Sequence, residues 1–126
     1  MLLFVYGNLM KKGENHDIIS GYSRFVSIAY VKGALYDLGV GFPAVVPDDT
    51  SEVYGEIYDV DDRLIPDLDC FEGFYPDGSD ESLFIRTQVE AKTFKKQVYS
   101  VYIYILPQDN LKKFASVERL EGGRWS

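Results

Sequence analysis

The apolar and polar positions of the chain follow mostly the period of β-strands. Residues 2–6 form a short apolar run that ends at a Gly-Asn pair, which predicts a fully buried strand followed by a tight loop. Residues 53–60 alternate as a half-buried strand does. Residues 84–94 and 97–106 predict two strands of a hairpin. The second is apolar on both faces, as is typical of a strand inside a sheet or barrel.

A further β-rich region covers residues 22–38, where Gly33 indicates a bulge or the close approach of another backbone. The strand breaks at residues 38–43 and is expected to resume at residues 44–46. After Pro107 the tail is polar, and we expect residues 109–126 to be partly helical.

One segment has the sequence pattern of a helix. Apolar side chains share one face of it at helical spacing: Leu64, Leu68 and Phe71. Asp61 or Asp62 can cap its start, Pro66 fits only in the first turn, and Gly73 supplies a C-terminal stop. Several predicted strands and one predicted helix indicate an α+β fold, a compact mixed sheet or small barrel.

Composition narrows the class of protein. The chain of 126 residues predicts a single domain, residues 1–126, and an aromatic share of 15% favours a sheet-rich interior. A net charge of −7 repels a phosphate backbone, so nucleic acid is not expected as the principal partner. No apolar run could span a bilayer or act as a secretory leader. The single cysteine cannot form an internal disulfide, which fits a reducing compartment. We therefore expect a soluble cytoplasmic protein without a membrane partner. No oligomeric state is predicted.

Few nucleophile or metal chemistries fit these residues. The one histidine, His16, stands in a turn and is expected to be solvated or capping, so a multi-histidine metal site is excluded. No phosphate-cradling or dinucleotide-binding glycine motif is present. Cys70 lies between Asp69 and Glu72, acids that disfavour a thiolate, and we expect it to pack in the core or half-buried.

Glu72 is a candidate general acid and base. It falls in the last turn of the predicted helix, at the negative end of the helix dipole. The aromatic neighbours Phe71, Phe74 and Tyr75 could exclude water from it and raise its pKa toward neutral. The alternative is a side chain that points into water or pairs with a lysine.

The second candidate site is the loop that follows the first strand, residues Tyr6, Gly7, Asn8 and Leu9. A loop that leaves a buried strand can present successive backbone N–H groups, and such a nest binds a carboxylate or a developing oxyanion. Gly7 would let a ligand approach the main chain. The alternative is a plain strand-ending turn.

Several short motifs together carry a family resemblance. They follow one another in this order: Tyr6-Gly7-Asn8-Leu9, Gly-Ala-Leu-Tyr-Asp-Leu-Gly at 33–39, Phe-Pro-Ala-Val at 42–45, Val-Tyr-Gly-Glu-Ile-Tyr at 53–58, Leu-Asp-Cys-Phe-Glu-Gly at 68–73 and Phe-Ile-Arg at 84–86. In order and spacing the chain resembles the gamma-glutamylcyclotransferase-like superfamily, including its AIG2-like and gamma-glutamylamine cyclotransferase branches.

The resemblance implies a small mixed β-barrel-like sheet with flanking helices and a cavity at one mouth. It implies that Glu72 is the acid/base, and that the loop from Tyr6 to Leu9 holds a small γ-glutamyl or aminoacyl amide. The reaction is then an intramolecular aminolysis that releases 5-oxoproline and needs no cofactor and no metal. Arg86 and Tyr36 are expected as supporting residues, although Arg86 could instead pair with a nearby acid.

Three departures from the family pattern keep alternatives open. Asn8 replaces a small hydroxyl residue, Met10-Lys11 replaces an arginine after the leucine, and Phe84 replaces a tyrosine. One alternative is a non-catalytic module that binds a small carboxylate or a partner on the same fold. Another is a hydrolase that uses Cys70.

Overall fold

The computed structural model describes residues 1–78 and 82–125. Its elements follow the chain in this order: β1 (Leu2–Val5), α1 (Asp17–Ser20), β2 (Ser23–Lys32), β3 (Ala34–Asp37), β4 (Pro43–Val46), β5 (Glu52–Val60), the 3₁₀ helix η1 (Asp62–Leu64), α2 (Ile65–Glu72), β6 (Ile85–Lys92), β7 (Val98–Ile105), the 3₁₀ helix η2 (Gln108–Lys113) and β8 (Glu118–Arg119).

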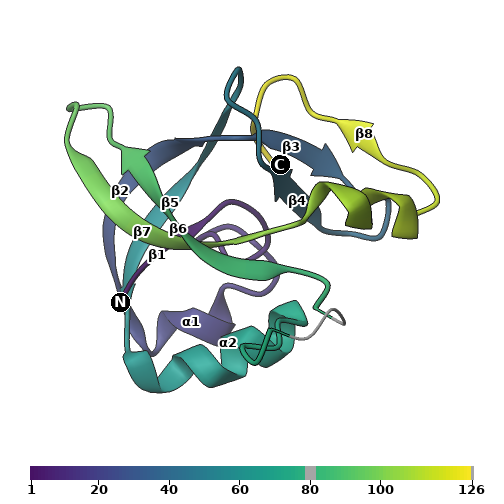
Figure 1. Ribbon diagram of the computed structural model, residues 1–126. Coiled ribbons are helices and arrows are strands. Elements are labelled where there is room, and N and C mark those ends of the chain that lie inside the picture. The colour runs from purple at the N-terminus through teal and green to yellow at the C-terminus, as the bar shows by residue number, and fades with distance from the viewer. Residues whose placement is uncertain (79–81, 126) are drawn as a thin grey trace.

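Five strands close into a barrel in the order β1-β5-β2-β6-β7. All neighbours are antiparallel except β1 and β7, which pair in parallel where Leu3 lies opposite Tyr102. The two α-helices, α1 and α2, lie together at one side of this barrel (Figure 1). The predicted α+β fold with a mixed barrel-like sheet is therefore confirmed, as is the interior position of β7.

A second sheet has the order β4-β3-β8 and lies beside the barrel on the side away from the helices (Figure 1). Gly33 is the point where the chain passes from the barrel strand β2 into this sheet, so residues 22–38 are not one continuous strand. The second prediction for Gly33, a close approach of another backbone, is confirmed, because the Gly33 N–H donates to the Ser51 carbonyl at 3.0 Å. The backbone N–H of Leu106 donates to the Val45 carbonyl at 2.8 Å and ties the end of β7 to β4. The tail is partly helical, as predicted, and also supplies β8.

Strand β1 is buried on both faces. Phe4 packs inside the barrel with Ile57 and Ile103. Leu3 and Val5 point the other way, into a second core that the helices cover. A continuous apolar run, rather than an alternating one, is what such a doubly buried strand requires. The end of β1 is thereby held rigidly from two sides.

The predicted helix boundaries agree with the structure. Asp61 Oδ1 accepts from the Arg63 N–H at 2.9 Å, and the 3₁₀ turn then continues into α2 with Pro66 in its first turn. Gly73 ends the helix with a φ of 67°, and the next N–H, of Phe74, donates to the Asp69 carbonyl at 2.8 Å.

One residue of the predicted apolar face was placed wrongly. Phe71 is 49% exposed, whereas Ile65, Leu68 and Asp69 are buried. At about 100° per residue, Ile65 and Asp69 lie on one side of Leu68 around the helix and Phe71 lies on the other, so the buried face excludes Phe71.

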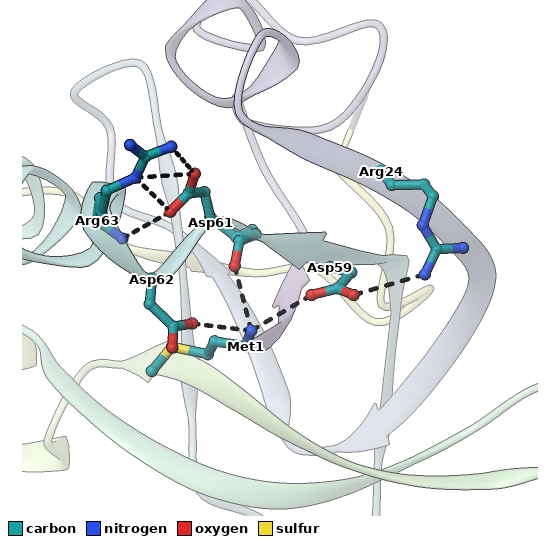
Figure 2. A network of polar contacts seen from close by, with 7 residues as sticks. Met1, Arg24, Asp59, Asp61, Asp62 and Arg63 are labelled. Atoms are coloured by element: carbon teal, nitrogen blue, oxygen red, sulfur yellow. Dashed lines mark hydrogen bonds and ion pairs between the residues drawn. The ribbon is translucent and has the colours of Figure 1, made fainter.

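The N-terminal ammonium links β1 to the segment that leads into α2 (Figure 2). The Met1 nitrogen lies 3.0 Å from Asp62 Oδ1 and 3.3 Å from Asp59 Oδ1. Its hydrogen bond to Asp62 is the largest influence that raises the pKa of this ammonium. Within the described residues, no helix has the length and apolar character of a membrane span.

Candidate active site

A cavity of about 420 Å³ brings both candidate sites together. It lies between the end of β1, the loop after it, the start of β4 and the C-terminal end of α2. Its described lining residues are Phe4, Val5, Tyr6, Gly7, Asn8, Leu9, Asn15, Phe42, Pro43, Cys70, Phe71, Glu72, Gly73, Leu83, Phe84 and Tyr104. Glu72 is the one acidic side chain in this lining, and none of these residues is basic.

Burial gives Glu72 an unusual titration. The residue is only partly exposed, and among the described residues its carboxylate has no hydrogen-bond or ion-pair partner. Removing a carboxylate from water penalises its charged form, and this raises the pKa of Glu72 to about 7. A carboxyl group with that pKa can both take and return a proton near neutral pH.

The residues that share the cavity with Glu72 come from several parts of the chain. Of its three aromatic neighbours in the sequence, Phe71 lines the same cavity but is 49% exposed, Tyr75 is 48% exposed, and Phe74 is half-buried. Tyr6 and Tyr104 also share the cavity lining with Glu72 and are themselves buried. After burial, the negative charge of Glu72 is a further cause that raises the pKa of the Tyr6 phenol.

The loop after β1 leaves successive backbone donors unused. Within the described part of the chain, the N–H groups of Gly7, Asn8 and Leu9 donate no hydrogen bond. The carbonyls of the same loop are engaged: that of Asn8 accepts from the Asn15 N–H at 2.9 Å. A run of free amide donors beside a cavity can donate hydrogen bonds to an anion, which favours the predicted nest over a plain turn.

His16 is a structural contact of this loop. Its Nδ1 donates to the Leu9 carbonyl at 2.8 Å, and its ring lies 5.6 Å from that of Tyr58. The residue occupies the N-cap position of α1, yet its side chain caps no N–H there. The predicted solvated or capping histidine is therefore corrected to one that holds the loop in place.

Gly7 is needed for a close approach of protein to protein. A Cβ added to it would lie 2.8 Å from Cγ of Pro43, closer than real Cβ atoms come. The substitution Gly7→Ala should therefore shift the loop against Pro43 and destabilise the fold by about 1–3 kcal/mol. Thermal unfolding measures this. Gly21→Ala is the matched control, because its added Cβ meets nothing within 4 Å. Equal stabilities for the two variants would contradict the close approach.

Asp69 and Tyr104 anchor the end of the helix, and the sequence reasoning missed both. Asp69 is 5% exposed, and its Oδ1 accepts from the Tyr104 hydroxyl at 2.7 Å. Arg86 Nε lies 3.0 Å from the same carboxylate. The Tyr6 hydroxyl in turn donates to the Tyr104 carbonyl at 2.7 Å. Asp69 precedes Glu72 by three residues, which puts the two side chains on one face of α2. The available signal was an aspartate on the buried face of an amphipathic helix.

Two of the remaining predicted residues, Arg86 and Tyr36, do not line the cavity, and the burial of Cys70 differs from the prediction. Arg86 pairs with Asp69, the alternative to a direct supporting role, and does not line the cavity. Tyr36 is half-buried on β3 and does not line it either. Cys70 is exposed at the cavity, and its expected core packing was wrong because it lies off the buried face of α2. In the described residues, no cluster of three or more His, Cys, Asp or Glu could hold a metal ion.

Comparisons with known proteins agree on one family. YkqA of Bacillus subtilis is 32% identical over 127 residues, which cover 98% of this chain and 40% of YkqA. The gamma-L-glutamyl-butirosin B gamma-glutamyl cyclotransferase of Niallia circulans is 30% identical over 88 residues, covering 70% of this chain and 56% of that enzyme. The chain thus spans less than two thirds of either relative.

Solved structures give the same result. The crystal structure of YkqA superposes with a TM-score of 0.72 at 28% identity, covering 98% of this chain and 39% of that one. A structure described as gamma-glutamyl cyclotransferase has a TM-score of 0.71 at 16% identity over 94% of this chain and 70% of its own, which shows the fold alone. The profile of the family described as gamma-glutamyl cyclotransferase, AIG2-like, matches residues 3–126, and the chain belongs to this family.

Proposed function

We propose that the protein is a γ-glutamyl cyclotransferase that releases 5-oxoproline from a γ-glutamyl amide or a related aminoacyl amide, with Glu72 as the general acid and base. One observation carries the proposal. A carboxyl group whose pKa is about 7 shares a cavity of about 420 Å³ with the unused amide donors of Gly7, Asn8 and Leu9. The named activities of the relatives support this chemistry.

The substrate would bring its own nucleophile. The Glu72 carboxylate takes a proton from the α-ammonium, and the resulting amine attacks the side-chain amide carbonyl to close a five-membered ring. Glu72 then returns that proton to the leaving nitrogen as its bond to carbon breaks. The ring nitrogen loses a second proton, and the released amine gains one. The products are 5-oxoproline, whose lactam nitrogen is neutral and which keeps its carboxylate, and an ammonium ion.

Binding would supply most of the remaining rate enhancement. The apolar walls hold the substrate folded back on itself, which raises the effective concentration of the amine at the carbonyl. The amides of Gly7, Asn8 and Leu9 hold the α-carboxylate or stabilise the oxyanion as it forms. Because the substrate's own amine is the nucleophile, the reaction does not need an activated serine or cysteine.

The test is a panel of γ-glutamyl dipeptides and γ-glutamyl amines, assayed for released 5-oxoproline. The proposal expects turnover of at least one member, and a wild-type level of turnover in Cys70→Ser. Tight binding of 5-oxoproline without turnover of any member would favour a non-catalytic carboxylate-binding module. Loss of activity in Cys70→Ser but not in a Glu72 variant would favour a cysteine hydrolase.

A further inference from the structure

We propose that the C-terminal strap, residues Gly122–Trp125, fixes the binding loop Tyr6–Leu9, and that Asn8 is a positioning residue rather than a ligand of the substrate. This inference rests on the proposed function, because it assigns what holds the amide donors of the same site in place.

Both polar atoms of the Asn8 side chain are engaged by the protein. Trp125 Nε1 donates to Asn8 Oδ1 at 3.0 Å, and Asn8 Nδ2 donates to the Gly41 carbonyl at 3.0 Å. An amide group can donate and accept at once from two separate atoms, whereas a serine or threonine hydroxyl has one short-reaching oxygen. The asparagine at this position thus joins three segments of the chain: the loop, the strap and the turn at Gly41.

The strap itself is anchored on the barrel. The backbone N–H of Tyr54 in β5 donates to the Gly123 carbonyl at 2.9 Å. The Arg124 guanidinium lies 4.1 Å from the centre of the Tyr54 ring, within cation–π distance. Trp125 packs against the core inside the barrel and does not line the cavity. The Trp125 side chain that donates to Asn8 is therefore held by a strap that is itself bound to the barrel.

The other end of this connection reaches the cavity wall. Gly41 immediately precedes Phe42 and Pro43, which line the cavity, and Pro43 packs closely against Gly7 of the loop. Trp125, Asn8 and Gly41 together hold the loop against that wall at a set distance. Donors held in place before a ligand arrives do not have to be ordered on binding, so affinity is gained. None of the groups in this connection titrates near neutral pH, which separates its effect from that of Glu72.

The substitution Trp125→Phe tests the proposal, because it keeps an aromatic ring at the packed position and removes the Nε1 donor together with one ring of the indole. We expect the heteronuclear NOE of the Asn8 and Leu9 amides to fall, which reports faster motion of the loop. With a γ-glutamyl substrate, KM should rise about fivefold, the effect of one lost hydrogen bond, while kcat changes less than twofold. The pH profile should keep its shape.

Asn8→Ala should raise KM at least as much, because it also breaks the hydrogen bond to the Gly41 carbonyl. The double variant should be no worse than Asn8→Ala, because both single substitutions break the same hydrogen bond between Trp125 and Asn8. Trp125 is the one tryptophan in the sequence. Its fluorescence in Asn8→Ala should therefore be quenched more readily by acrylamide, which checks that the contact exists in solution.

The matched control is Thr93→Val, which removes one hydrogen-bond acceptor, that for the Gln97 N–H in the β6–β7 hairpin, and should leave KM and the loop amides unchanged. An unchanged NOE, an unchanged KM or additive effects in the double variant would overturn the positioning role. A wild-type protein that turned over no substrate would instead count against the proposed function, and the NOE comparison would still decide whether the strap holds the loop.

Discussion

The substitution Glu72→Gln is expected to lower kcat by about three orders of magnitude while 5-oxoproline binding stays near that of the wild type. Glutamine keeps the shape of the side chain but cannot exchange a proton, and general acid–base groups contribute roughly 10²–10⁴-fold. In the wild type, kcat/KM should rise with pH through a limb near pH 7, because the carboxylate form is the base and its pKa is about 7. Steady-state rates between about pH 5 and pH 9 measure both effects.

The same substitution should stabilise the protein above pH 7. The pKa of Glu72 rises from its ordinary value of 4.5 to about 7 on folding, so the folded state holds the proton more tightly. The free energy of unfolding therefore falls as pH rises from about 4.5 to 7, and the loss is complete above 7. Glutamine avoids this loss, which amounts to about 3 kcal/mol at most. Denaturant unfolding at pH 8 should show the gain, and unfolding at pH 4 should show none.

Glu56→Gln is a suitable control, since Glu56 lies on β5 and its carboxylate accepts from the Tyr58 hydroxyl at 3.0 Å, without lining the cavity. It should keep kcat and show no stabilisation at pH 8. Full activity in Glu72→Gln would remove the proposed acid/base role. Lost activity without a gain in stability would indicate that Glu72 is ionised and solvated in the folded protein.

The parts of the fold that depend on short-range chemistry could be predicted from the sequence. Asp61 as a cap, Pro66 in a first turn and Gly73 at a C-terminus each act on backbone groups within a few residues. Strand β1, which is buried on both faces, could be predicted for a similar reason, because such burial requires apolar residues throughout the strand. The candidate site was also found in this way, since one acid at a helix end and one loop after a strand are local patterns.

Contacts between distant segments could not be predicted in this way. The edge strand β8 of the second sheet has only two residues and carries no sequence pattern of its own. Asn8 and Trp125 are 117 positions apart, and nothing local to either residue indicates the hydrogen bond between them. The burial of Glu72 was expected from the residues beside it in the chain, whereas the buried side chains that share its cavity include Tyr6 and Tyr104, which are far from it in the sequence. Which groups surround a side chain is decided by the fold as a whole.

The carboxylate of Asp69 is expected to stabilise the fold more than any other single polar side chain of the site. Asp69→Ala should lower the free energy of unfolding by about 3–5 kcal/mol, because it leaves the Arg86 charge buried without its partner. The Arg86 side chain is 19% exposed and lies between the rings of Phe74 and Tyr102, at 5.7 and 5.5 Å from their centres. Water therefore cannot easily replace the lost carboxylate. The Tyr104 hydroxyl would lose its acceptor as well.

A double variant separates the cost of an unpaired charge from the value of the pair. Asp69→Leu with Arg86→Met removes both charges and fills their space with apolar groups, an exchange that is often neutral. We expect it to recover most of the stability that Asp69→Ala loses, with the unpaired Tyr104 hydroxyl accounting for the remaining deficit of about 1–2 kcal/mol. Chemical unfolding of the wild type, both single variants and the double variant completes the cycle. Additive effects would show that Asp69 and Arg86 act independently. Since Asp69 also orients the helix end that carries Glu72, the double variant should still show a lower kcat, although its stability is restored.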